Sequence, residues 1–95
     1  MEILTETQKK LYNLFYESTH NNQHLDSKME VLVGLSAALA MNCEPCINYY
    51  LKFAKNNNVS KGELSELIAK VMAVAAGQKR LQAEAIINNS GLDFE

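Results

Sequence analysis

The sequence predicts an all-α protein, a bundle of about five helices in one domain over residues 1–95. Turn-forming residues are scarce, with one proline and four glycines, and no hairpin dipeptide separates two alternating apolar runs. Apolar residues recur instead at spacings of three and four, which is the period of an amphipathic helix. Almost half of the residues are apolar, so a core can form and self-association would enlarge it.

The first two helices are predicted on either side of a polar connector. Residues 5–18 carry leucines and a phenylalanine on one face and lysines on another, and residues 20–24 are polar. Ser27 and Glu30 are spaced as a capping box, in which each side chain satisfies an exposed backbone N–H near the other. The helix that follows runs to Met41 and is apolar nearly all round, so we expect it to be central.

Three further helices complete the prediction. One runs from the only two cysteines to about Lys55, with a proline in its first turn, where a missing N–H costs little. Ser60 and Glu63 form a second capping box before an apolar stripe at helical spacing. Gly77 is expected either to break this helix or to allow a close contact, and a last helix is predicted over residues 79–89.

Charge and hydropathy exclude several classes of protein. The net charge of -2, with lysines and acids interspersed, gives no footprint for nucleic acid or for anionic lipid. The longest apolar run is about half of the ~20 residues that a membrane span requires. Residues 1–6 lack the basic start and apolar stretch of a signal peptide, so we expect a cytoplasmic protein.

Cys43 and Cys46 are the most informative residues of the chain. They lie two residues apart at the predicted start of a helix, where two thiols can close a small disulfide ring. Unpaired N–H groups and the positive end of the helix stabilise a thiolate there. In a reducing compartment such a pair is more often redox-active or metal-binding than structural. The spacing therefore favours a dithiol that exchanges with disulfides.

From about Leu25 to Asn89 the chain resembles the carboxymuconolactone decarboxylase family, in particular its AhpD-like (alkyl hydroperoxide reductase D-like) thiol branch. The resembling segments are residues 32–40, 43–50 and 59–64, in the order and at the spacing of the family. The resemblance implies an all-helical fold, assembly as a homo-oligomer (trimer or hexamer) and chemistry at the cysteine pair.

The thiol branch shows Glu, eleven residues, Cys-x-x-Cys, three residues and His. Both cysteines match, but the glutamate position falls on Val31 and the histidine position on Tyr50. Glu30 is one residue away, and one residue rotates a helical side chain by about 100°, so it is no automatic substitute. The capping box is a sufficient structural explanation for Glu30.

The roles of the candidate residues follow from their positions. Cys43 lies closest to the free N–H groups, whereas Cys46 stacks with Tyr50 four residues on, so the identity of the attacking thiol stays open. Tyr50 can donate a hydrogen bond to a thiolate or pack as an aromatic. His20 and His24 lie in the polar connector, where we expect solvent exposure.

The expected activity is that of a thiol–disulfide oxidoreductase and antioxidant protein with catalytic residues Cys43, Cys46 and Tyr50. It would reduce protein or small-molecule disulfides and, less surely, hydroperoxides (peroxiredoxin-type activity), draw electrons from a thiol donor, and need no cofactor or metal. Three alternatives remain open: a non-catalytic helical assembly module, a carboxymuconolactone decarboxylase-type enzyme, and a metal or cluster protein. A metal site needs about four ligands, so two thiols would require a second subunit or the histidines.

Overall fold

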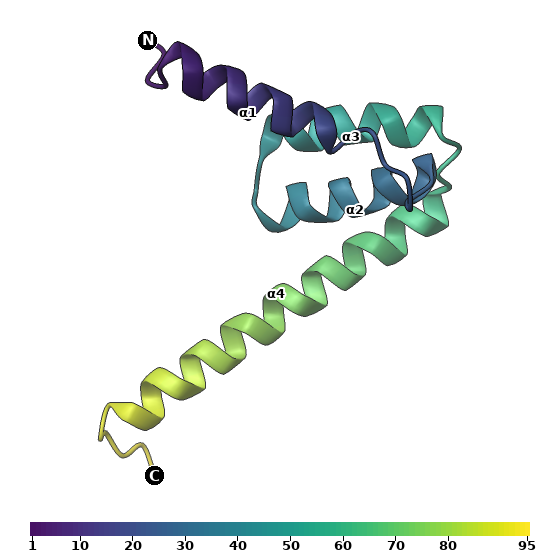
Figure 1. Cartoon of the computed structure of the whole chain (residues 1–95). Coiled ribbons are helices and arrows are strands. Elements are labelled where there is room, and N and C mark those ends of the chain that lie inside the picture. The colour runs from purple at the N-terminus through teal and green to yellow at the C-terminus, as the bar shows by residue number, and fades with distance from the viewer.

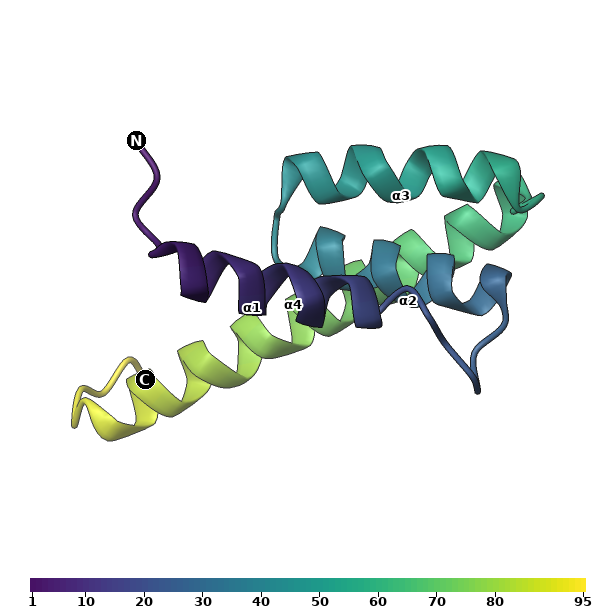
Figure 2. The same cartoon turned by 45° about the horizontal axis from the view of Figure 1, so that its top comes forward.

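The computed structural model describes all 95 residues and confirms a helical chain without strands. Its helices, in order, are α1 (Glu6–Ser18), α2 (Ser27–Ala40), α3 (Glu44–Asn56) and α4 (Lys61–Asn89). α2 and α3 form a hairpin, and α4 packs against α2 alone before it runs past the hairpin as a long arm (Figures 1 and 2). The backbone of α1 makes no close approach to that of any other helix.

The expectation that the second helix is central is confirmed. α2 packs against both α3 and α4. It holds three of the four buried residues of the chain, Val31, Leu35 and Ala38, and the fourth is Ala54 of α3. The small core therefore lies within the hairpin, and Leu35, with 1% of its surface exposed, is at its centre.

The predicted helix count of five is wrong, because Gly77 does not end a helix. α4 continues without interruption from Lys61 to Asn89. One glycine inside a helix costs only about 1 kcal/mol relative to alanine. The neighbours on both sides, such as Ala76 and Gln78, are good helix formers, so this cost is less than that of breaking the helix.

The predicted capping box at Ser27 and Glu30 is also wrong. The residue that caps α2 is Asp26, whose carboxylate accepts a hydrogen bond from the backbone N–H of Met29 at 2.8 Å. Ser27 is the first helical residue instead. An aspartate is as good a cap as a serine and adds a negative charge at the positive end of the helix, so it takes the position. Glu30 is thereby released for another partner.

The second predicted capping box is confirmed. The Ser60 hydroxyl accepts from the Glu63 N–H at 3.1 Å, and the Glu63 carboxylate accepts from the Ser60 N–H at 2.9 Å. α1 begins with another capping box, between Thr5 and Gln8, which was not predicted from the sequence. Helix starts in this chain are therefore encoded locally.

The chain is extended. Its Cα radius of gyration is 18.5 Å, whereas a compact domain of this length has about 12 Å. Only 4 of 95 residues are buried. Neither α1 nor α4 contains a buried residue, and large apolar side chains are exposed along both.

Candidate functional site

The cysteine pair lies in the short connection between α2 and α3. Asn42 turns the chain there with a φ of 54°, a left-handed conformation that asparagine tolerates better than most residues. The N–H of Cys43 then donates to the carbonyl of Ala38 at 3.0 Å, which ties the connection to the end of α2. Cys43 occupies the N-cap position of α3 without a side-chain capping hydrogen bond, and Cys46 lies in the first turn of the helix.

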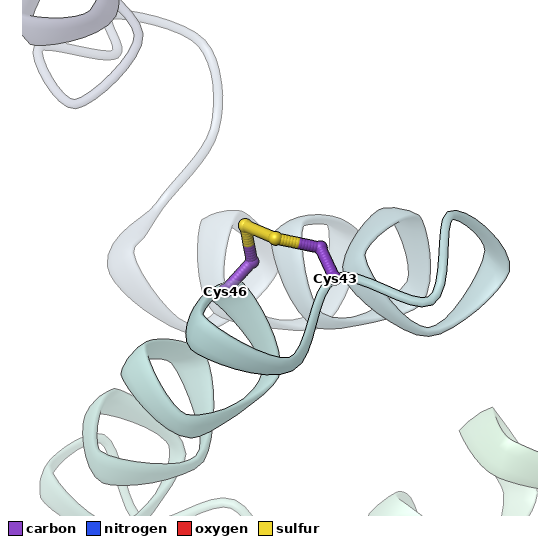
Figure 3. Close-up of a disulfide and its surroundings, with 2 residues drawn as sticks. All are labelled: Cys43 and Cys46. Carbon is purple, nitrogen blue, oxygen red and sulfur yellow. A yellow bond between two sulfur atoms is a disulfide. The ribbon is translucent and has the colours of Figure 1, made fainter. Parts of the chain in front are cut away.

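The two cysteines form a disulfide, with Cα atoms 5.2 Å apart (Figure 3). The expected ring is therefore present, and neither residue is fully buried. An apolar cavity of about 230 Å³, here called the disulfide cavity, contains both of them and opens on the surface of the hairpin. Its other lining residues are Tyr16, Gly34, Ala37, Ala38, Met41 and Tyr50.

The start of α3 offers positive electrostatic potential to the sulfur atoms. The first N–H of the helix that finds a backbone acceptor is that of Ile47, which donates to the carbonyl of Cys43 at 2.9 Å. Pro45 has no N–H, and those of Glu44 and Cys46 make no hydrogen bond within the chain. Free donors at a helix N-terminus stabilise a thiolate in general, so these N–H groups suit a reduced cysteine at this position.

Tyr50 lies against α2 because Gly34 leaves room for it. A Cβ added to Gly34 would overlap the Tyr50 ring, so only glycine permits this approach. Burial raises the pKa of the Tyr50 phenol above its ordinary value, and the nearby Tyr16 and Glu30 groups raise it further. The phenol therefore stays protonated near pH 7 and can donate a hydrogen bond, but it is not a base on its own.

The prediction that His20 is exposed to solvent is wrong. Its Nδ1 lies 2.9 Å from Oε1 of Glu30, and the side chains are 25% and 24% exposed, respectively. The His20 ring also packs on Tyr16 at 4.8 Å and on Tyr49 at 5.7 Å between ring centroids. These aromatic rings shield the pair from water. His24 is exposed, as expected.

Glu30 and His20 line a second cavity of about 320 Å³, here called the histidine cavity. Its other lining residues are Ser27, Val31, Tyr49, Tyr50, Phe53 and Asn57. Tyr50 lines both cavities, the one that holds the disulfide and the one that holds the Glu30–His20 pair. Sequence reasoning missed this arrangement. The one local signal was the spacing of Tyr16 and His20, four residues apart at the end of α1.

Two general properties of the molecule bear on its chemistry. No three or more His, Cys, Asp or Glu side chains gather into a group that could hold a metal ion. None of the four helices combines the length and the apolar character needed to cross a membrane.

Comparison with known proteins supports the resemblance noted in the sequence. The family model described as carboxymuconolactone decarboxylase family matches residues 6–89, which is most of the chain and includes all four helices. No curated protein and no solved structure matches the chain.

Proposed function

Because the chain belongs to the carboxymuconolactone decarboxylase family, which includes AhpD-like oxidoreductases, we propose that it is a thiol–disulfide oxidoreductase. The observation that carries this proposal is the Cys43–Cys46 disulfide at the start of α3. The sulfur atoms lie in an apolar cavity beside free N–H groups, and neither cysteine is fully buried. These are the surroundings of a reactive cysteine pair.

The proposed reaction transfers two electrons and two protons from the dithiol to a disulfide substrate. One cysteine thiolate attacks a substrate sulfur, the substrate S–S bond breaks, and the leaving thiolate takes a proton. The second cysteine then attacks the mixed disulfide, releases the other substrate thiol and closes the Cys43–Cys46 bond. A thiol donor reverses these steps and is itself oxidised to a disulfide. Tyr50 donates a hydrogen bond to the sulfur that carries negative charge.

The substrate class is a protein disulfide or a small disulfide, and the disulfide cavity favours one with apolar flanking groups. Peroxide reduction is the secondary activity: the thiolate attacks a peroxide oxygen, the O–O bond breaks and an alcohol or water leaves. The second cysteine then attacks the resulting sulfenic acid, which closes the disulfide and releases water. We place the protein in the cytoplasm, where thiol pools keep such a pair reduced.

We also propose a homo-oligomer, a trimer or a hexamer. Exposed apolar residues continue along the whole of α4, among them Met72, Val74, Leu81 and Ile86. Monomeric proteins rarely leave apolar surface of this extent uncovered. Light scattering should give a mass of three or six chains, and a monomer at micromolar concentration would contradict the assembly.

The activity is tested with a chromogenic disulfide and with insulin, using the wild type and each of Cys43→Ser and Cys46→Ser. The wild type should turn over with a thiol donor, and both variants should lose turnover, because neither can close the intramolecular disulfide. Wild-type rates in both variants would contradict the proposal. Such a result would favour the non-catalytic assembly module. That alternative is supported by Val31 and Tyr50, which replace the glutamate and the histidine of the family pattern.

A further inference from the structure

The side chain of His20 is held in one orientation by Glu30. The distance between Nδ1 and the carboxylate oxygen Oε1 is 2.9 Å. An ionised carboxylate can only accept a hydrogen bond, so Nδ1 carries the proton and Nε2 is the nitrogen left for chemistry. Because His20 lies in the connector and Glu30 lies in α2, the pair also fixes the connector against α2.

Nε2 of His20 is buried and has no hydrogen-bond partner. No other buried side-chain nitrogen or oxygen atom in the chain lacks a partner. Buried polar atoms are nearly always paired, so an exception calls for an explanation. His20 packs on aromatic rings of α1 and α3 and lines the histidine cavity. An oriented and desolvated imidazole nitrogen is therefore present without a structural partner.

Tyr50 connects this imidazole with the cysteine pair. It lines the histidine cavity together with His20 and Glu30, and the disulfide cavity together with Cys46. Cys46 and Tyr50 are four residues apart on α3 and so lie on one face of that helix. A phenol can accept one proton while it donates another, which is what a relay between two sites requires.

We propose that His20, oriented by Glu30, is the base and acid of the cysteine pair, and that it exchanges a proton with Cys46 through the Tyr50 hydroxyl. The inference rests on the proposed thiol–disulfide activity. When the dithiol is activated, the Cys46 thiol gives its proton to the Tyr50 oxygen, and the phenol proton passes to Nε2. The products are a thiolate and an imidazolium that is paired with the Glu30 carboxylate. This proton leaves with the substrate thiol. When a thiol donor later reduces the disulfide, a proton from the donor passes along the same path to the departing Cys46 sulfur.

The groups around His20 suit this role. α1 contributes Tyr16, α2 contributes Glu30, and α3 contributes Tyr49 and Tyr50, whereas α4 brings no residue into either cavity. Burial raises the pKa of Tyr49 and of Tyr50, so these phenols remain neutral near pH 7. Glu30 is then the only charged side chain among these groups, and its negative charge favours the imidazolium that the proton transfer produces.

The test measures how fast iodoacetamide alkylates Cys46 between pH 5 and 10 in a full-length Cys43→Ser background, where Cys46 is the only thiol. The midpoint of this profile should lie below the value of about 8.5 for a free cysteine. His20→Gln should raise the midpoint by about one pH unit, which lowers the rate at pH 7 about tenfold. His24→Gln, in the same connector but exposed, is the matched control and should leave the midpoint unchanged.

Two further variants separate a relay from a merely structural contact. Tyr50→Phe should raise the midpoint as far as His20→Gln does, and combining the two should add nothing, because they act in series. Glu30→Gln keeps an acceptor oxygen for Nδ1 but removes the charge, so it should give a smaller rise. A structural role for His20 would lower the thermal midpoint of unfolding without moving the alkylation midpoint.

The outcomes distinguish this inference from the proposed function. If the wild type reduces disulfides but His20→Gln leaves the alkylation midpoint in place, or if the shifts of His20→Gln and Tyr50→Phe add, the relay is overturned and the activity stands. If Cys46 does not react with iodoacetamide or a small disulfide at any pH, both are overturned.

Discussion

The α2–α3 hairpin and the two outer helices are built differently. All four buried residues of the chain lie in the hairpin, and both cavities of the candidate site are formed mainly by its residues. α1 and α4 contain no buried residue, although α4 is the longest helix in the molecule. The candidate site therefore lies mainly in the part of the chain that packs on itself.

The outer helices owe their order to local signals. Both begin with capping boxes, at Thr5 and at Ser60, yet apolar residues are exposed along each of them. In most proteins, tertiary packing stabilises a helix more than its own propensity does. The proposed homo-oligomer would let α1 and α4 complete their packing on other copies of the chain.

The largest difference between the regions is expected for leucine truncations. Leu35→Ala, at a site that is 1% exposed, should lower the free energy of unfolding by about 2–5 kcal/mol, because it removes apolar contacts and leaves a cavity. Leu81→Ala, at a site that is 67% exposed in the single chain, should cost less than about 1 kcal/mol. Urea unfolding followed by circular dichroism measures both.

Repeating both unfolding measurements at several protein concentrations makes this first comparison sharper. The Leu81→Ala loss should shrink on dilution, because in the proposed homo-oligomer Leu81 packs on another chain, whereas the Leu35→Ala loss should not change. Equal losses for the two variants at every concentration would mean that the outer helices pack within the chain after all.

Two of the three glycines inside helices, Gly34 and Gly77, should give effects of intermediate size and of opposite sign. Gly34→Ala forces a methyl group into the Tyr50 ring and should destabilise the protein by about 1–3 kcal/mol. Gly77→Ala meets open space in the single chain and should raise helix stability by up to about 1 kcal/mol. Thermal unfolding of both variants checks the signs.

Gly34→Ala should also slow thiol reactivity, since it displaces Tyr50 from the disulfide cavity. A neutral Gly34→Ala would show that Tyr50 does not occupy this position. A destabilising Gly77→Ala would place another chain against that face of α4.

The smallest expected effect is a pH dependence at the start of α4. The backbone N–H of Ser60, and then the side chain of Lys28, lower the pKa of Glu63 below its ordinary value. Because the pKa of Glu63 is lower in the folded state, its carboxylate stabilises the protein at pH values above the ordinary pKa of 4.5. This stabilisation is lost as the pH falls through the pKa of the folded state.

Glu63→Gln tests that pH dependence, because it keeps the shape of the cap and removes the titration. Between pH 5 and pH 3 the melting temperature of the wild type should fall more than that of Glu63→Gln. Parallel curves would contradict a role for the Glu63 charge.

Features fixed by neighbouring residues could be predicted from the sequence. The Ser60–Glu63 cap, the start of α3 at the cysteine pair and the central place of the apolar helix all follow from local patterns. The error at Ser27 arose because two adjacent residues were both good caps, and Asp26 took the position. The prediction at Gly77 was wrong because the good helix formers on both sides of the glycine outweigh its local cost.

The candidate site could be predicted only in part. The spacing of the two cysteines is a local signal that predicts their pairing. The His20–Glu30 contact joins residues ten positions apart, and no periodic pattern in the sequence predicts it. The packing of Tyr50 over Gly34 joins two helices and likewise leaves no local trace. These contacts depend on how α1, α2 and α3 meet, which the sequence pattern does not specify.

The central claim, that Cys43 and Cys46 form a dithiol that exchanges electrons, is tested most directly by redox titration. The protein is equilibrated in glutathione buffers of defined potential, its free thiols are trapped by alkylation, and the intact mass is measured. We predict one two-electron transition between a doubly alkylated form and an intramolecular disulfide that takes no label. Thiols that stay free in the most oxidising buffer, or that bind glutathione separately without joining each other, would contradict the claim.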